Sequence, residues 1–179
     1  MKKANFTLMP FIILATLLGF LAYELFHAKP QALPSALIGQ SLPNFRLPSL
    51  LEPGKNFSAA ELQGRVSLLN IWATWCSACR IEHETLIIIN QRDHVPLFSI
   101  DYKDNPEDAK LWLKNLGNPY EKIGEDTQGD LGIDLGIYGT PETFIIDKQG
   151  KIRYRHVGAL DENTWQEVLL PLVRQYERE

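Results

Sequence analysis

The sequence predicts an α/β fold, a mixed central sheet flanked by helices, preceded by one N-terminal transmembrane helix. Three observations predict it. An apolar run without charge lies near the start of the chain. Nearly continuous apolar runs of strand length then alternate with helix-capping signals, and the last two strand-like runs flank a turn. The predicted order is β-α-β-α-β-β-α, with parallel strands first and a hairpin last.

The N-terminal segment 6–23 contains no charged residue. Eighteen residues at about 1.5 Å rise span roughly 27 Å, close to the hydrocarbon thickness of a bilayer. A cleaved signal peptide would have a shorter apolar core followed by small residues, whereas Glu24 and His27 follow here. The pattern favours an uncleaved anchor. Lys2 and Lys3 precede it, which predicts a cytoplasmic N-terminus and export of the remainder.

We therefore divide the chain into an anchor at 1–26, a proline-containing linker at 27–39 and one domain at 40–179. A domain of that size buries enough surface to form its own core. The net charge of -4, with no basic stripe, gives no support to nucleic-acid binding.

The first half of the domain contains the clearest local signals. Ser58 and Glu61 match a capping box that opens a short helix. Residues 66–72 (VSLLNIW) predict a strand buried on both faces, and a helix is expected from about Cys76 to Asn90.

The second half continues the alternation. Residues 96–102 (PLFSIDY) predict a strand, and Asn105 with Pro106 predicts the start of a helix that Gly117 ends. Two strands, 142–147 and 151–157, flank a turn. The final helix is expected to start near Asp161, with Pro171 as a local kink.

The chemistry is expected at the turn after the first buried strand. Cys76 and Cys79 are the two cysteines of the chain, three positions apart at the start of a helix. A loop that short gains little closure entropy, so the pair is a poor structural staple. A helix N-terminus lowers a thiol pKa, which predicts an exposed nucleophile at Cys76 and a resolving thiol at Cys79.

Two other uses of a Cys-x-x-Cys pair have less support. A zinc site needs two more ligands; His83 is one helical turn from Cys79, but no second pair completes the set. Haem attachment needs histidine directly after the second cysteine, where Arg80 stands.

Longer strings carry a specific resemblance. NIWATWC, CRIEH, DYKDNPE, LGNPY, GIYGTPETFIID and KIRYRHVG resemble the DsbE/CcmG branch of the thioredoxin superfamily, membrane-anchored thiol:disulfide interchange proteins of cytochrome c maturation. The similarity covers most of residues 39–176. It implies a thioredoxin-like fold. One departure is Ser77, where the branch commonly has proline.

The resemblance implies roles for further residues. Pro141 matches the cis-proline beside the redox pair, Thr140 would present its backbone to an extended client, and Trp75 would shield the sulfurs. Glu82 and Glu142 are candidate proton carriers, and a surface role is about as well supported for each. Asp101 and Asp104 lie at the end of the second strand, and a solvated role is favoured for Asp104. The segment 119–139 corresponds to the branch's insertion near the site.

The expected function is reduction of disulfides in c-type cytochrome biogenesis. The implied client is apocytochrome c, whose haem-attachment disulfide must be opened, or a mixed disulfide with another maturation thiol protein. The implied place is the bacterial inner membrane, with a single membrane pass and the C-terminal domain in the periplasm. A transmembrane electron donor of the DsbD/CcdA kind would re-reduce the pair, and neither a metal nor a cofactor beyond the Cys76–Cys79 disulfide is expected.

Three alternatives stay open. The client could be a copper-site protein during oxidase assembly. The pair could, with a histidine, form a copper-binding chaperone, although the ligand set is incomplete. A strongly oxidising potential would instead indicate an oxidase.

Overall fold

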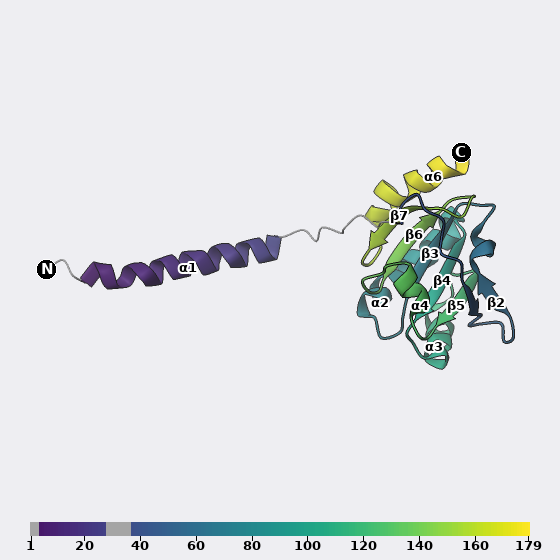
Figure 1. The fold of residues 1–179 in the computed structure, drawn as a ribbon, viewed down its shortest axis with the longest axis horizontal. Helices are drawn as coiled ribbons and strands as arrows, with labels where there is room; N and C mark the ends of the chain where they lie inside the picture. The colour runs from purple at the N-terminus through teal and green to yellow at the C-terminus, as the bar shows by residue number, and fades with distance from the viewer. Residues whose placement is uncertain (1–3, 28–36) are drawn as a thin grey trace. The chain divides into compact units, whose positions relative to one another are not determined.

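The computed structural model describes residues 4–27 and 37–179, so Lys2, Lys3 and most of the expected linker lie outside the described residues. The chain forms two compact units, Met1–Leu33 and Pro34–Glu179. The first contains α1 (Ala4–His27) (Figure 1). Its large apolar side chains between Met9 and Tyr23 are exposed. Within the described part of the chain, no helix meets the length and hydropathy expected of a membrane span. The transmembrane helix therefore stays a prediction.

A five-stranded sheet in the order β5-β4-β3-β6-β7 forms the centre of the second unit (Figure 1). Strands β3, β4 and β5 are parallel, while β6 is antiparallel to β3 and β7 is antiparallel to β6. The sheet is thus mixed, as predicted. Its strands are β3 (Ser67–Trp72), β4 (Leu97–Tyr102), β5 (Lys122–Asp126), β6 (Glu142–Ile146) and β7 (Ile152–Val157).

Helices follow the strands and begin at the expected capping residues. Asn105 caps α3 by accepting a hydrogen bond from the Glu107 amide, Asp161 caps α5 through the Thr164 amide, and the Ser58–Glu61 capping box opens a 3-10 turn. The helical segments are η1 (Ala59–Leu62), α2 (Ser77–Ile88), the π-turn η2 (Ile89–Asp93), α3 (Pro106–Leu116), α4 (Asp130–Asp134), α5 (Glu162–Thr164), the π-turn η3 (Trp165–Leu169) and α6 (Leu170–Arg178).

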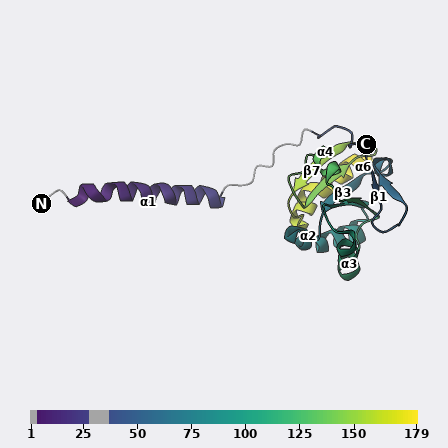
Figure 2. The same cartoon turned by 60° about the horizontal axis from the view of Figure 1, so that its bottom comes forward.

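Two apolar clusters cover the two faces of the sheet. Leu68 and Trp72 of β3 pack with α2, α3, η3 and α6, whereas Leu69 and Ile71 pack with β2 and α4. Figure 2 shows α2 and α3 together on one side of the strands and α4 on the other. All six residues of β3 are buried, as its continuous apolar run predicts.

Three features were not predicted. β1 (Arg46–Pro48) and β2 (Asn56–Ser58) form a small antiparallel pair, and the 119–139 segment contains both β5 and α4. The expected insertion is therefore in part an edge strand of the main sheet. The sequence KIGED has one large apolar side chain, Ile123, and therefore shows no apolar run that would predict a strand.

Candidate functional site

The two sulfurs lie at the N-terminus of α2 and form a disulfide. Cys76 is the N-cap residue, and its Sγ accepts a hydrogen bond from the Cys79 amide at 3.0 Å. That amide is one of the unpaired N–H groups of the first helical turn, so it stabilises negative charge on Cys76. The expectation of an exposed nucleophile is wrong for this oxidised state, because Cys76 is 5% exposed and Cys79 is 2% exposed. The first turn of α2 and the underlying core enclose both cysteines.

The predicted cis-proline lies next to this turn. The Thr140–Pro141 peptide bond is cis, the isomer that the resemblance implies. Because Glu142 pairs with Ile71 in antiparallel register, Pro141 and Thr140 lie beside the end of β3, where the turn to Cys76 begins. The Thr140 hydroxyl is buried and has no hydrogen-bond partner. The role of the Thr140 backbone in binding an extended client remains a prediction.

Trp75 is the exposed aromatic of the site, with 58% of its surface accessible. Its indole N–H donates to the Lys103 carbonyl at 3.0 Å, which fixes the ring against the segment after β4. An anchored aromatic of this kind offers apolar area to a client at little entropic cost.

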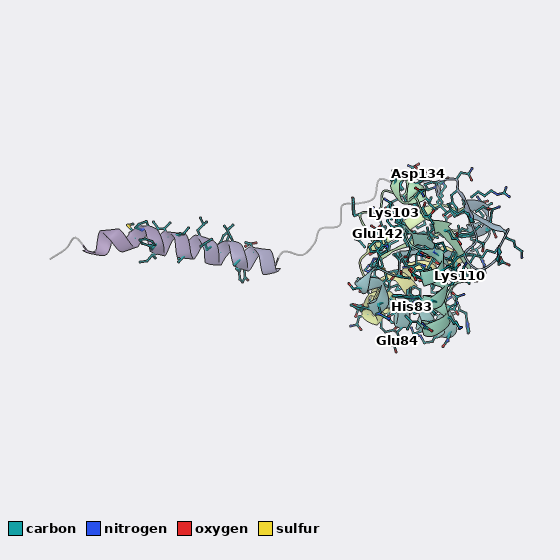
Figure 3. All side chains as sticks on the ribbon, turned by 90° about the horizontal axis from the view of Figure 1, so that it is seen from below. His83, Glu84, Lys103, Lys110, Asp134 and Glu142 are labelled. Carbon is teal, nitrogen blue, oxygen red and sulfur yellow. A yellow bond between two sulfur atoms is a disulfide. The ribbon has the colours of Figure 1, made fainter. Side chains whose placement is uncertain are left out.

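Glu142 is buried in a complete ion pair. Its two carboxylate oxygens accept from Arg155 at 2.6 and 2.8 Å, and one also accepts from the Tyr138 amide at 2.8 Å. The Arg155 guanidinium also donates to the Gly136 carbonyl at 2.9 Å. Figure 3 labels Glu142 and Lys103 among the side chains of the domain. The guanidinium compensates the charge of the buried carboxylate, so this geometry favours a structural role.

Glu82 has a different environment. It is 1% exposed and lies one helical turn beyond Cys79 on the buried face of α2. Its oxygens accept from the Asn70 side-chain amide and the Leu160 backbone amide, both at 2.9 Å, and no cation faces them. Burial raises the pKa of the Glu82 carboxyl to about 7, against these two hydrogen bonds, which lower it. Such a group exchanges a proton near neutral pH.

The Asn70 side chain organises this buried network. It donates to Glu82 and to the Thr143 hydroxyl, and its carbonyl accepts from the Tyr120 hydroxyl at 2.8 Å. Sequence reasoning missed Asn70, Tyr120 and Arg155. A polar residue inside the apolar run VSLLNIW was the available signal for Asn70.

We expect Glu82→Gln to change how stability depends on pH. The wild-type carboxyl has a raised folded pKa, so the unfolded chain releases its proton first and wild-type stability falls as pH rises from about 4.5 to about 7. Relative to the variant, the wild type should lose about 3 kcal/mol across that window. Urea unfolding at several pH values measures this difference. If the difference in unfolding free energy between the wild type and Glu82→Gln is constant with pH, the pKa of Glu82 is not raised. Glu84→Gln on the same helix is the control.

Asp104 was expected to be a solvated side chain, and this is wrong. It is half-buried and accepts hydrogen bonds from the backbone amide and the hydroxyl of Thr74, two residues before Cys76. Asp101 is 1% exposed at the end of β4. Both aspartates therefore belong to the edge of the site.

His83 is occupied by structural contacts. Its Nε2 donates to the Gly117 carbonyl at 3.0 Å, its Nδ1 accepts from the Trp112 indole at 3.3 Å, and burial lowers its pKa. Neither ring nitrogen is free to join the cysteines in a metal site. Among the described residues, no three His, Cys, Asp or Glu side chains are grouped to hold a metal ion.

Comparisons with known proteins agree with this geometry. The Redoxin family matches residues 37–169. The thiol:disulfide interchange protein DsbE of Yersinia pestis is 50% identical over 149 residues, which are 83% of this chain and 79% of that protein. DsbE of Escherichia coli strain K12 is 44% identical over 99% of this chain and 98% of that protein.

Solved structures show the same thioredoxin-like fold. A secreted thiol-disulfide isomerase from Corynebacterium glutamicum has a TM-score of 0.64 at 25% identity, covering 74% of this chain and 85% of that one. A putative DsbE from Chlorobium tepidum has a TM-score of 0.61 at 23% identity, covering 76% of this chain and 94% of that one, and shows the fold alone.

Proposed function

Because this chain belongs to the Redoxin family and, within it, to the DsbE thiol:disulfide interchange proteins, we propose that it reduces disulfides in the periplasm during c-type cytochrome biogenesis. Its activity as a thiol:disulfide oxidoreductase follows from the family; the client and the compartment are the proposal. The observation that carries the proposal is the placement of the Cys76–Cys79 pair at a helix N-terminus, one turn from a buried carboxyl that titrates near neutral pH.

The reaction begins with the reduced pair. The Cys76 thiolate attacks one sulfur of the client disulfide, and a mixed disulfide forms as the client's other sulfur leaves as a thiolate. The Glu82 carboxylate takes the proton of Cys79, whose thiolate attacks the Cys76 sulfur. The client's two sulfurs leave as thiolates and take up two protons, one from the Glu82 carboxylic acid and one from solvent. The chain retains the Cys76–Cys79 disulfide, so two electrons pass to the client.

The burial of the cysteines and Glu82 supports this direction of electron flow. The reaction leaves a closed disulfide and a neutral carboxylic acid, and both are compatible with the apolar surroundings. The carboxylate is needed only while Cys79 loses its proton. A transmembrane donor of the DsbD/CcdA kind then supplies two electrons and two protons to restore the thiols.

The proposed clients are apocytochrome c, at the disulfide of its haem-attachment cysteines, and mixed disulfides of other maturation thiol proteins. Thioether attachment needs free thiols, which an oxidising compartment removes. We also propose that α1 is the membrane anchor, supported by its exposed apolar side chains from Met9 to Tyr23. Tethering would raise the effective concentration of the domain near membrane-bound partners.

A trapping experiment tests the proposed client. Cys79→Ser keeps the attacking thiol and removes the resolving one, so we expect disulfide-linked complexes with cytochrome c apoproteins or maturation proteins to accumulate in the bacterial envelope. Non-reducing gels and mass spectrometry identify the trapped chains. Cys76→Ser/Cys79→Ser, which lacks both thiols, is the control.

The trapped proteins also separate the proposal from its alternatives. Recovery of copper-site proteins alone, together with normal c-type cytochromes after gene loss, would contradict the cytochrome role and assign a copper-site client. An equilibrium potential near -120 mV would contradict reduction and indicate an oxidase.

A further inference from the structure

The segment after β4 holds the turn that leads to the cysteines. Asp104 accepts from the amide and the hydroxyl of Thr74, the latter at 2.8 Å, and also from the Asn105 amide at 2.8 Å. The neighbouring Trp75 indole donates to the Lys103 carbonyl at 3.0 Å. Two consecutive residues of the active-site turn, directly before Cys76, are therefore fixed by two consecutive residues after β4.

The backbone at Lys103 has an uncommon conformation. Its φ of 49° lies in the left-handed region, which non-glycine residues seldom adopt. The left-handed residue turns the chain out of β4, so the Lys103 carbonyl meets Trp75 and the next side chain, Asp104, meets Thr74. The Lys103 amide remains tied to the sheet through the Asp126 carbonyl at 3.0 Å. Backbone strain of this kind collects where a functional site must be held in place.

Asp101 lies near the end of β4, three residues before Asp104. It is 1% exposed, and neither of its carboxylate oxygens has an N–H or O–H donor. Its side chain interacts instead with the Asp104 carboxyl. Two ionised carboxylates only accept hydrogen bonds and repel each other, so this contact becomes a hydrogen bond when one of the pair holds a proton. Asp104 already accepts three other hydrogen bonds, so the proton belongs on Asp101.

Of the other titratable groups around Asp101, Glu125 also raises the pKa of Asp101. Glu125 is opposite it on β5 and is half-buried, and Tyr120 is a buried neutral phenol. Lys110 of α3 pairs with Glu107 and acts on Glu125. No positive charge within the described surroundings of Asp101 compensates an ionised carboxylate.

We propose that Asp101 is a positioning residue of the redox site, whose protonated carboxyl donates to Asp104 and thereby holds that carboxylate on Thr74 and the turn of Cys76. Burial first, and then the Asp104 charge, raise the pKa of Asp101 to about 8. Loss of its proton above that pH places two negative charges together, so Asp104 moves away and the turn loosens. The Cys76 turn is then clamped at neutral pH and released in mildly alkaline solution.

Nuclear magnetic resonance tests the clamp without any client. We use the full chain in detergent micelles, with ¹³C in the aspartate carboxyl groups and ¹⁵N in the amides. One aspartate carboxyl should titrate near pH 8, and the Thr74 amide should shift with the same midpoint. Asp101→Asn should abolish both titrations and leave the Thr74 amide near its wild-type low-pH position, because the asparagine N–H₂ replaces the proton donor.

Reduction kinetics provide a second readout, which rests on the proposed function. Asp101→Leu has no donor and should slow single-turnover reduction of a model disulfide by about tenfold at pH 7, the equivalent of one charge-assisted hydrogen bond. Asp101→Asn should keep the wild-type rate at pH 7. Above pH 8 the wild-type rate should fall as Asp101 loses its proton, and the rate of Asp101→Asn should not show this fall. Asp108→Asn, an exposed aspartate in the first turn of α3, is the matched control.

A Thr74 amide that stays constant between pH 6 and pH 9.5 in the wild type would overturn the inference. An Asp101→Asn variant as slow as Asp101→Leu would also overturn it, because a donor at this position would then be irrelevant. If Asp101→Leu does not fold, the wild-type and Asp101→Asn titrations still decide. A wild-type chain that reduces no disulfide would count against the proposed function, while the Thr74 titration would still decide the role of Asp101.

Discussion

Cys76→Ser is expected to lower the rate of disulfide reduction by roughly 10³-fold or more, because a serine hydroxyl cannot replace a thiolate nucleophile at neutral pH. The Cys79 amide donates to the Cys76 sulfur, and the α2 N-terminus adds its dipole, so the site stabilises an anion that serine does not form. Stopped-flow reduction of a fluorescent disulfide by the pre-reduced full chain measures the rate.

The matched control for this prediction is Ser77→Ala, the next residue, which is exposed at the first position of α2. It should change the rate by less than about threefold, because no thiol is lost. Because the chain has two cysteines, a Cys76→Ser variant that keeps a tenth of the wild-type rate would show that Cys79 can attack directly. The assignment of nucleophile and resolving thiol would then be reversed.

The sequence predicted the elements whose signals are local. The β3 run 66–72, the Asn105–Pro106 helix start and the hairpin of β6 and β7 all form as expected, because buried strands need continuous apolar residues and helix ends need capping groups. Pro171 lies in the first turn of α6, directly after the π-turn η3, and the kink expected there stays a prediction. β1, β2 and α4 were missed because each is five residues or fewer and gains its stability from packing on the sheet.

The residues of the candidate site also differ in whether local sequence signals could predict them. The positions of Cys76 and Cys79 follow from one strand-to-helix turn, which is local information. The environments of Glu82 and Glu142 do not, because their partners come from distant segments: Leu160 meets Glu82 and Arg155 meets Glu142. Two glutamates that looked equivalent in the sequence therefore differ in kind, one without a cation and one within an ion pair.

We expect Arg155→Met to destabilise the fold by about 3–5 kcal/mol, since it leaves a buried carboxylate without its cation. Both side chains of the pair are buried, Arg155 at 5% and Glu142 at 0% exposure. After the substitution Glu142 retains the Tyr138 amide as its donor, and the Gly136 carbonyl loses its partner. Urea unfolding of the full chain in micelles at pH 7 measures the loss.

Arg153→Met is the matched control, two residues earlier on the same strand. Arg153 also pairs with a carboxylate, at 2.6 Å to Asp147, but its side chain is 29% exposed and Asp147 keeps backbone donors from Gln149 and Lys151. We expect it to cost about 1 kcal/mol. The double variant Glu142→Gln/Arg155→Met should recover most of the larger loss, because it removes the stranded charge as well. Equal losses in Arg155→Met and in the double variant would contradict this account, since the cost would then come from lost packing of the arginine side chain.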